Sequence, residues 1–227
     1  MFSAANPIWN PWANDSQTLK LYRRRCRQEA EEMTCAVQAA EILADKVVSS
    51  GTLLDAGCGG GYYYWSLLKR GVKVDYFGLD YTPEMMELAR TEMCPRANLA
   101  PERFILDSIE NLEQEFDNII CFNVLTNSPH YALPLKRLLT CARKRILIRE
   151  SLGADLTVRY TPDPYLNEDK RHIRVYHNTY PIKEVIAFME EHDFKVTRIR
   201  DERSQDGVEM VCDIPHQWRI LLGERTA

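Results

Sequence analysis

Short apolar strand patterns alternate with helical patterns along most of the chain, and this alternation constrains the fold more than any other feature. Between residues 52 and 150 the sequence predicts strands at 52–56, 73–79, 103–106, 116–122 and 145–150, and helices at 62–70, 83–92 and 133–143. Strands and helices in this order build βαβ units, whose strands pair in parallel. The pattern therefore predicts an α/β fold with a Rossmann-like, doubly wound sheet.

The two ends of the chain add to this core. No Gly or Pro occurs from residue 16 to 48, which predicts one long helix or two with a break near Glu29. A helix from Pro181 to about residue 192 and strands at 194–201 and 218–223 bring the sheet to seven strands, with a further strand possible at 208–212.

These patterns divide the chain into two parts. We predict an N-terminal helical segment at 1–50 and a Rossmann-like domain at 51–227. Trp9 and Trp12 suggest that the N-terminus folds over the core and covers the site. A polar, tyrosine-rich stretch at about 151–180 is too long for an ordinary connection, and such segments are often lids or binding loops.

Polar residues stand at the predicted carboxyl ends of the five strands: Asp55, Asp80, Asp107, Asn123 and Glu150. Ligands of doubly wound sheets bind beyond this edge. The repeated placement of acids there predicts a ligand site built from several strand ends.

A glycine turn, Asp55-Ala-Gly57-Cys-Gly59-Gly-Gly, follows the first strand. Glycines allow positive φ and a close approach of ligand to backbone. A dinucleotide fingerprint would need glycine at position 62 or 64, where tyrosines stand. An acid before the first glycine would repel a pyrophosphate and suits a ligand with a cation, such as an α-amino group. The alternative is a turn that binds no ligand.

Two further acids suit a nucleoside. Asp80 comes about 20 residues after the turn, where an acid accepts both ribose hydroxyls, although it could instead cap the next helix. Tyr81 either lies on an adenine face or packs in the core. Asp107 can accept a hydrogen bond from an adenine amine or stabilise a turn.

The segments LLDAGCGGG, YFGLDYTPEMMELAR, FILDSIENL and FDNIICFNVL, in this order and spacing, resemble class I S-adenosylmethionine-dependent methyltransferases over residues 50–150. The resemblance implies S-adenosylmethionine as cofactor, S-adenosylhomocysteine as product and an antiparallel last strand. It also implies cofactor contacts in three groups. The methionine end would be held by Asp55, Gly57, Cys58, Gly59, Phe122 and Asn123, the ribose by Asp80 beside Tyr81, and the adenine by Asp107, Ser108 and Ile109.

The sequence lacks several motifs that are typical of particular methyl acceptors, and this narrows the acceptor class. The family's Asn-Pro-Pro-aromatic motif for amide and exocyclic amine acceptors is replaced by Phe-Asn-Val-Leu at 122–125, and no Pro-Cys nucleophile or clear metal-binding acid set occurs. A hydroxyl, carboxyl or amine of a small molecule remains. A protein or RNA methyltransferase of the same fold, and a non-catalytic cofactor-binding subunit, stay open as alternatives.

Several residues are candidates for contact with the acceptor. His130 lies just beyond the fourth strand and is a candidate general base, with an exposed loop position as the alternative. Tyr62, Tyr131, His172, His177 and Tyr180 are candidate acceptor contacts. For His172 and His177 the alternative is a solvated hairpin.

Composition sets the remaining expectations. The net charge of -4 argues against nucleic acid as partner. Seven scattered cysteines without a CxxC pair indicate neither a disulfide framework nor a metal site, which favours a cytoplasmic location. No apolar run is long enough to span a membrane, and the N-terminus does not resemble a signal peptide. The oligomeric state is left open.

Overall fold

The computed structural model describes residues 11–12, 15–46, 51–163, 166–170, 172–211 and 213–226. The expectations for Trp9 and Cys212 fall outside these residues. Trp12 is half-buried, and its carbonyl oxygen accepts a hydrogen bond from the Asp15 backbone N–H at 3.3 Å, just before the first helix.

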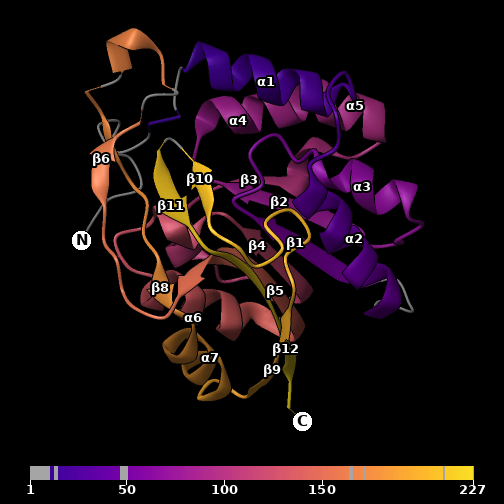
Figure 1. Cartoon of the computed structure of the whole chain (residues 1–227). Coiled ribbons are helices and arrows are strands. Elements are labelled where there is room, and N and C mark those ends of the chain that lie inside the picture. The colour runs from indigo at the N-terminus through magenta and orange to yellow at the C-terminus, as the bar shows by residue number, and fades with distance from the viewer. Residues whose placement is uncertain are drawn as a thin grey trace.

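A twisted sheet forms the centre of the molecule (Figure 1). Its strands follow the order β3-β2-β1-β4-β5-β12-β9, with β8 (Tyr180–Pro181) attached beside the end of β5. The seven strands of this order are β1 Thr52–Ala56, β2 Asp75–Asp80, β3 Phe104–Leu106, β4 Phe116–Phe122, β5 Ala142–Gly153, β9 Phe194–Ile199 and β12 Trp218–Arg225. The first five pair in parallel, and β12 runs antiparallel to both β5 and β9. The predicted fold class and the antiparallel last strand are confirmed.

Helices cover both faces of this sheet. One apolar core lies between the sheet and the helices that precede and follow β1, and a second lies between the sheet and α6 and α7. The helices are α1 Ser16–Cys26, α2 Thr34–Lys46, α3 Tyr63–Lys69, α4 Pro83–Leu88, α5 Cys94–Ala97, α6 Ala132–Cys141 and α7 Ile182–Glu190, with a π-helical turn Ala89–Met93 joining α4 to α5. The break predicted near Glu29 separates α1 from α2.

The stretch 151–180 contains more structure than the sequence predicted. β6 (Tyr160–Pro162) and β7 (Arg174–Tyr176) form an antiparallel pair. β5 also continues past the predicted end at residue 150, because Leu152 and Gly153 pair with β8. The possible strand at 208–212 is β10 (Glu209–Val211), which pairs with β11 (Ile214–His216) in a separate hairpin.

The first helix is attached to this stretch at its N-terminus. The carboxylate of Asp15 caps α1 by accepting from the Thr18 N–H at 2.9 Å, and its other oxygen accepts from the Asn167 N–H at 2.9 Å. An N-cap of this kind satisfies one of the otherwise unbonded N–H groups of the first turn. One side chain therefore connects the N-terminal helical segment to residues 151–180.

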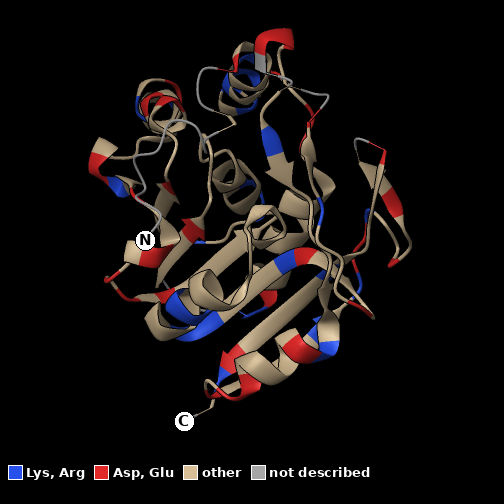
Figure 2. Ribbon diagram, turned by 90° about the vertical axis from the view of Figure 1, so that its left-hand side faces the viewer, with Lys and Arg blue, Asp and Glu red and all other residues tan. Residues whose placement is uncertain are grey.

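Charges are mixed on the surface. Figure 2 shows Lys and Arg interspersed with Asp and Glu along the ribbon in that view. Within the described parts of the chain, no helix has both the length and the apolar character required to cross a membrane.

Candidate active site

The glycine turn lies between β1 and α3. Gly57 and Gly59 have φ values of +78° and +53°, in the region that glycine adopts most easily. A Cβ on Gly57 would lie 2.3 Å from a methyl group of Val124, and one on Gly59 would lie 2.3 Å from the Tyr22 ring. The N–H groups of Gly57 and Cys58 donate to the Leu79 carbonyl oxygen at 2.7 and 3.0 Å, which fixes the turn against β2.

Asp55 is buried directly beneath this turn. The Tyr76 hydroxyl donates to its carboxylate at 2.7 Å. Burial, opposed by the Tyr76 hydrogen bond and reinforced by the nearby charge of Asp80, raises the pKa of Asp55 to about 7. A buried acid favours its neutral form unless a cation pairs with it, so this carboxylate is suited to a positively charged group.

Asp80 joins the turn to the next helix. One carboxylate oxygen accepts from the Gly59 N–H and the other from the Thr82 N–H, both at 2.9 Å. The Thr82 side chain and the Tyr81 N–H also act on this carboxylate, which stands at the end of β2 where a ribose contact is predicted. Thr82, rather than Asp80, occupies the N-cap position of α4. Tyr81, next to Asp80, is half-buried.

Asp107, at the end of β3, is half-buried in a short turn. Its carboxylate accepts from the Ser108 N–H at 2.7 Å and from the Asn111 side-chain amide at 2.8 Å. Ile109 is buried and begins a 3-10 helix. The local bonds match the turn alternative, and the adenine contact stays a prediction.

Phe122 and Asn123 end β4. The Phe122 ring packs at right angles against Tyr63 at 6.0 Å. Asn123 adopts a φ of 59°, its N–H donates to the Arg149 carbonyl oxygen at 2.8 Å, and its side-chain oxygen accepts from the Arg149 guanidinium at 2.5 Å. The carboxyl edge therefore brings Asp55, the glycine turn, Asp80 and Asn123 to neighbouring strand ends.

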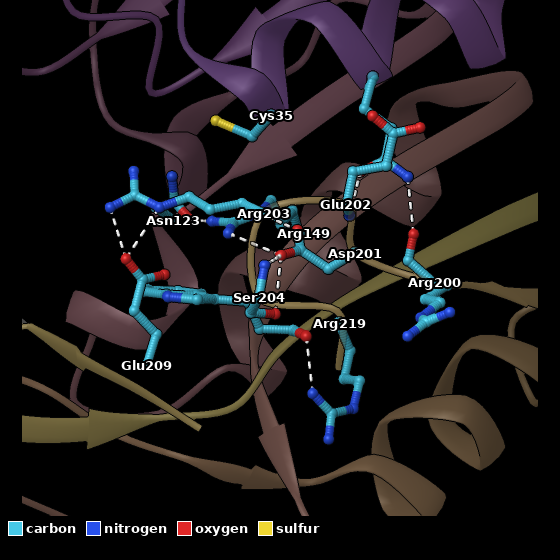
Figure 3. Close-up of polar contacts among 12 residues, drawn as sticks. Cys35, Asn123, Arg149, Arg200, Asp201, Glu202, Arg203, Ser204, Glu209 and Arg219 are labelled. Carbon is cyan, nitrogen blue, oxygen red and sulfur yellow. Dashed lines mark hydrogen bonds and ion pairs between the residues drawn. The ribbon is translucent and has the colours of Figure 1, made fainter. Parts of the chain in front are cut away.

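A buried ion pair missed by the sequence reasoning lies beside Asn123. Arg149 Nε donates to the Asp201 carboxylate at 2.5 Å and Nη2 donates at 3.3 Å (Figure 3). Burial would raise the pKa of Asp201, but the hydrogen bond and charge of Arg149 outweigh it and lower the pKa. The only sequence signal was a charged residue inside the apolar strand RILIRE.

Glu150, the acid at the fifth predicted strand end, has a structural role. Its carboxylate accepts from the N–H groups of Val124, Leu125 and Thr126 at 2.8–3.0 Å. It therefore holds the loop that follows β4.

A group of aromatic side chains lies near the end of β5. His216 stacks on Trp218 with ring centroids 4.7 Å apart and an angle of 5°, and the Arg149 guanidinium lies 4.6 Å from the Trp218 ring. His177 meets His216 at 5.7 Å. Of these residues the sequence predicted only His177 as an acceptor contact. We call the set of His177, His216 and Trp218 the histidine cluster.

The tyrosines after the glycine turn, Tyr62 and Tyr63, both contact the N-terminal helical segment. The Tyr62 hydroxyl donates to the Met33 sulfur at 2.8 Å and accepts from Arg25 at 3.3 Å. The Tyr63 hydroxyl lies 3.0 Å from the Cys35 sulfur. Both side chains therefore pack toward α1 and α2, so an acceptor contact by Tyr62 requires these helices to form part of the site.

The other predicted acceptor contacts are Tyr131, His172 and Tyr180, and the predicted general base is His130. Tyr180 is buried, its hydroxyl lies 2.8 Å from the Ser128 carbonyl oxygen, and its ring packs on Tyr131 at 5.0 Å. His130 and His172 are exposed. The roles of these four residues stay predictions.

The first helix covers the glycine turn. Tyr22 lies over Gly59, and the sulfur of Cys26 lies against Gly60. The Arg25 guanidinium is 5.4 Å from the Tyr22 ring and 5.0 Å from the Tyr62 ring.

Comparisons with known proteins agree with this geometry. A family model described as a methyltransferase domain matches residues 48–163, just over half of the chain. A search of curated proteins found no match. Among solved structures, the magnesium protoporphyrin IX methyltransferase of Synechocystis PCC 6803 with bound S-adenosylmethionine aligns with a TM-score of 0.64 and 18% identity, over 98% of this chain and 99% of that chain.

Two further structures share the fold. The 1,6-didemethyltoxoflavin-N1-methyltransferase of Burkholderia thailandensis aligns with a TM-score of 0.60 and 19% identity, over 94% of this chain and 87% of that chain. A protein in complex with the Haloferax volcanii Trm112 methyltransferase activator aligns with a TM-score of 0.60 and 12% identity, over 94% and 98%. The family match, the strand order and the glycine turn agree, and the chain belongs to the class I S-adenosylmethionine-dependent methyltransferases.

Proposed function

We propose that the enzyme transfers the methyl group of S-adenosylmethionine to a hydroxyl, carboxyl or amine of a small molecule by in-line displacement. The observation that carries the proposal is the buried carboxylate of Asp55 beneath a glycine turn, at an edge where Asp80 and Asn123 also end their strands. These groups fit the cofactor: an acid for its α-amino group and a turn without Cβ atoms for its methionine end.

The remaining cofactor contacts follow from the strand ends. Asp80 would accept from the ribose hydroxyls, with Tyr81 beside it. Asp107, Ser108 and Ile109 would line the adenine, and Phe122 and Asn123 would close the methionine end. When bound, the cofactor supplies an activated methyl group with its own leaving group.

The protein must then align the acceptor with the methyl group and exclude water. Such positioning can supply about 7–11 kcal/mol of the barrier. In this proposal α1 and the stretch 151–180 cover the site and exclude water. The two segments meet where Asp15 and Ser16 contact Asn167. Tyr22 lies over Gly59, so this part of α1 lies against the turn proposed to hold the methionine end.

Several observations support a small acceptor. The net charge is -4 and charges of both signs are interspersed in Figure 2, which does not suit a nucleic-acid surface. Two similar structures are named for methylation of magnesium protoporphyrin IX and 1,6-didemethyltoxoflavin. One similar structure is a complex with the Trm112 methyltransferase activator, so a macromolecular acceptor is the alternative.

Calorimetric titration with S-adenosylmethionine and S-adenosylhomocysteine tests the first step. Saturable binding, followed by methylation of a member of a metabolite panel, is the expected result. Absence of binding at millimolar cofactor would contradict the proposal, whereas methylation of purified RNA or protein alone would favour the macromolecular alternative.

A further inference from the structure

Asn123, at the carboxyl end of β4, has one polar group that is not bonded to the protein. Its backbone N–H donates to the Arg149 carbonyl oxygen at 2.8 Å, and its backbone carbonyl oxygen accepts from the Asn127 side-chain amide at 3.1 Å. Its side-chain oxygen accepts from Arg149 Nη1 at 2.5 Å. The side-chain NH2 group has no hydrogen-bond partner among the described residues and retains contact with solvent. Its two N–H donors therefore remain for a ligand or for water.

The orientation of this amide follows from the chemistry of its neighbour, Arg149. A guanidinium group donates hydrogen bonds and cannot accept them. The amide oxygen of Asn123 must therefore face Arg149, which lies beside it in Figure 3, and the NH2 group must point away from it. Rotating the amide by half a turn would place donors against donors.

Arg149 is itself held in one position. Its side chain is 3% exposed, and its guanidinium is paired with the Asp201 carboxylate, which is 0% exposed. Asp201 also accepts from the backbone N–H and the hydroxyl of Ser204, both at 2.8 Å. The Trp218 ring lies 4.6 Å from the guanidinium. Buried supporting contacts of this kind lock the groups that meet a ligand.

The backbone of Asn123 supports a role in a site. Its φ of 59° lies in the left-handed region, which asparagine adopts more readily than most residues. Conformations of this kind cluster at ligand sites, where the surrounding structure holds them in place. The two bonds to Arg149 and the one to Asn127 supply that restraint.

The end of β4 lies against the proposed cofactor turn. β4 pairs with β1, where Ile120 is opposite Asp55. A methyl group of Val124, the residue after Asn123, lies 2.3 Å from the position of a Cβ on Gly57. The methionine end of the cofactor carries an ammonium group, which Asp55 suits, and a carboxylate, which needs hydrogen-bond donors. An ionised aspartate cannot donate, whereas the amide nitrogen of Asn123 can.

We propose that the NH2 group of Asn123 donates a hydrogen bond to the carboxylate of the cofactor's methionine end, and that Arg149 is the positioning residue that orients this donor. The assignment rests on the proposed function and deepens it. It gives one cofactor contact a defined polarity and names the buried ion pair that sets this polarity.

The test compares S-adenosylmethionine with its decarboxylated analogue, which keeps the sulfonium and amino groups and lacks the carboxylate. Calorimetric titration of the full chain measures both affinities. The unmodified protein should bind S-adenosylmethionine at least about tenfold more tightly, since hydrogen bonds to charged groups are the stronger ones. Asn123→Ala should lower the affinity for S-adenosylmethionine at least about tenfold and leave that for the analogue nearly unchanged.

Matched variants separate donation from folding. Asn98→Ala removes an exposed asparagine whose φ is also positive, at 53°, and should change neither affinity. The double variant Arg149→Met with Asp201→Leu removes the group that orients the amide without leaving a buried charge unpaired. Its preference for S-adenosylmethionine over the analogue should fall several-fold, with the affinity for the analogue retained. Arg149→Lys, which lacks the planar fork of donors, provides the same comparison if the double variant does not fold.

Each contrary result has a defined meaning. Equal binding of the two ligands by the unmodified protein, or an unchanged preference in folded Asn123→Ala, overturns the donor. Equal losses for both ligands in Asn123→Ala overturn it as well, because they indicate a structural role. A full preference in the folded Arg149 variants overturns the positioning role alone. Failure of the unmodified protein to bind either ligand overturns the proposed function together with this inference.

Discussion

Buried polar groups are hydrogen-bonded differently in the two halves of the sheet's carboxyl edge. In the cofactor half, each acid already has neighbours: Asp55 has Tyr76, Asp80 has two backbone N–H groups, and Asp107 has its own turn. In the half toward β12, a fully paired ion pair, Arg149–Asp201, lies beside histidines whose ring nitrogens have no partner among the described residues.

The difference separates acids held by local hydrogen bonds from buried histidines packed without them. Short-range bonds hold the cofactor acids in position before any ligand arrives, which is the preorganisation that lowers the cost of binding. Nε2 of His177 and both ring nitrogens of His216 have no such bonds within the part of the chain that the structure describes. Four predictions test this comparison.

The largest effect is expected at the ion pair. Arg149→Met leaves the Asp201 carboxylate, which is 0% exposed, without its cation, and should lower the free energy of unfolding by about 3–5 kcal/mol. Urea denaturation measures it. The double variant Arg149→Met with Asp201→Leu should recover most of the loss, because replacing a whole buried pair is often neutral. A loss below about 1 kcal/mol in the single variant would show that the pair is dispensable.

The next effect concerns Asp55. Asp55→Asn should weaken S-adenosylmethionine binding about 10–100-fold, because a hydrogen bond to a charged group contributes about 1.5–3 kcal/mol. Calorimetry measures the affinity. Asp107→Asn, at the half-buried turn, is the matched control and should change it only a few-fold. Equal effects at both positions would remove the distinction between the two acids.

The pH dependence of cofactor binding follows from the same carboxylate. The pKa of Asp55 is raised to about 7 in the folded protein, so the acid is protonated there over a range in which the unfolded chain is ionised. The contribution of Asp55 to stability therefore falls as pH rises from about 4 to 7. The cofactor ammonium requires the ionised form, so affinity should rise about tenfold between pH 5.5 and 7.0. Asp55→Asn should abolish this rise, and a persisting rise would assign it to another group.

The smallest effect is expected where the N-terminus of α1 meets the stretch 151–180. Asp15→Ala removes the cap of α1 and the bond to the Asn167 N–H, and should cost about 1 kcal/mol. Hydrogen exchange of the α1 amides should accelerate, while the sheet amides stay protected. Asp155→Ala, at an exposed position in the same stretch as Asn167, serves as control. Unchanged exchange in Asp15→Ala would show that packing alone holds α1.

Local patterns in the sequence determined the fold and which residues stand at the strand ends of the proposed cofactor half. Strand and helix periods, the glycines at 57 and 59 and the acids at 55 and 80 act through neighbours in the chain or through the shared edge of a parallel sheet, so their consequences can be read residue by residue. The same reasoning placed the break between α1 and α2 and the final strand pair.

Only the tertiary structure decided which side chains meet in the half toward β12. Arg149 meets Asp201 across 52 positions, His177 meets His216 across 39, and Asp15 meets Asn167 across 152. No local motif predicts such pairs, because they depend on strand register and on where long segments return. His130, the histidine that the sequence favoured, is exposed, and His216, which it passed over, is buried beside Trp218. Burial gives a histidine its chemical environment, and burial is a property of the packed fold.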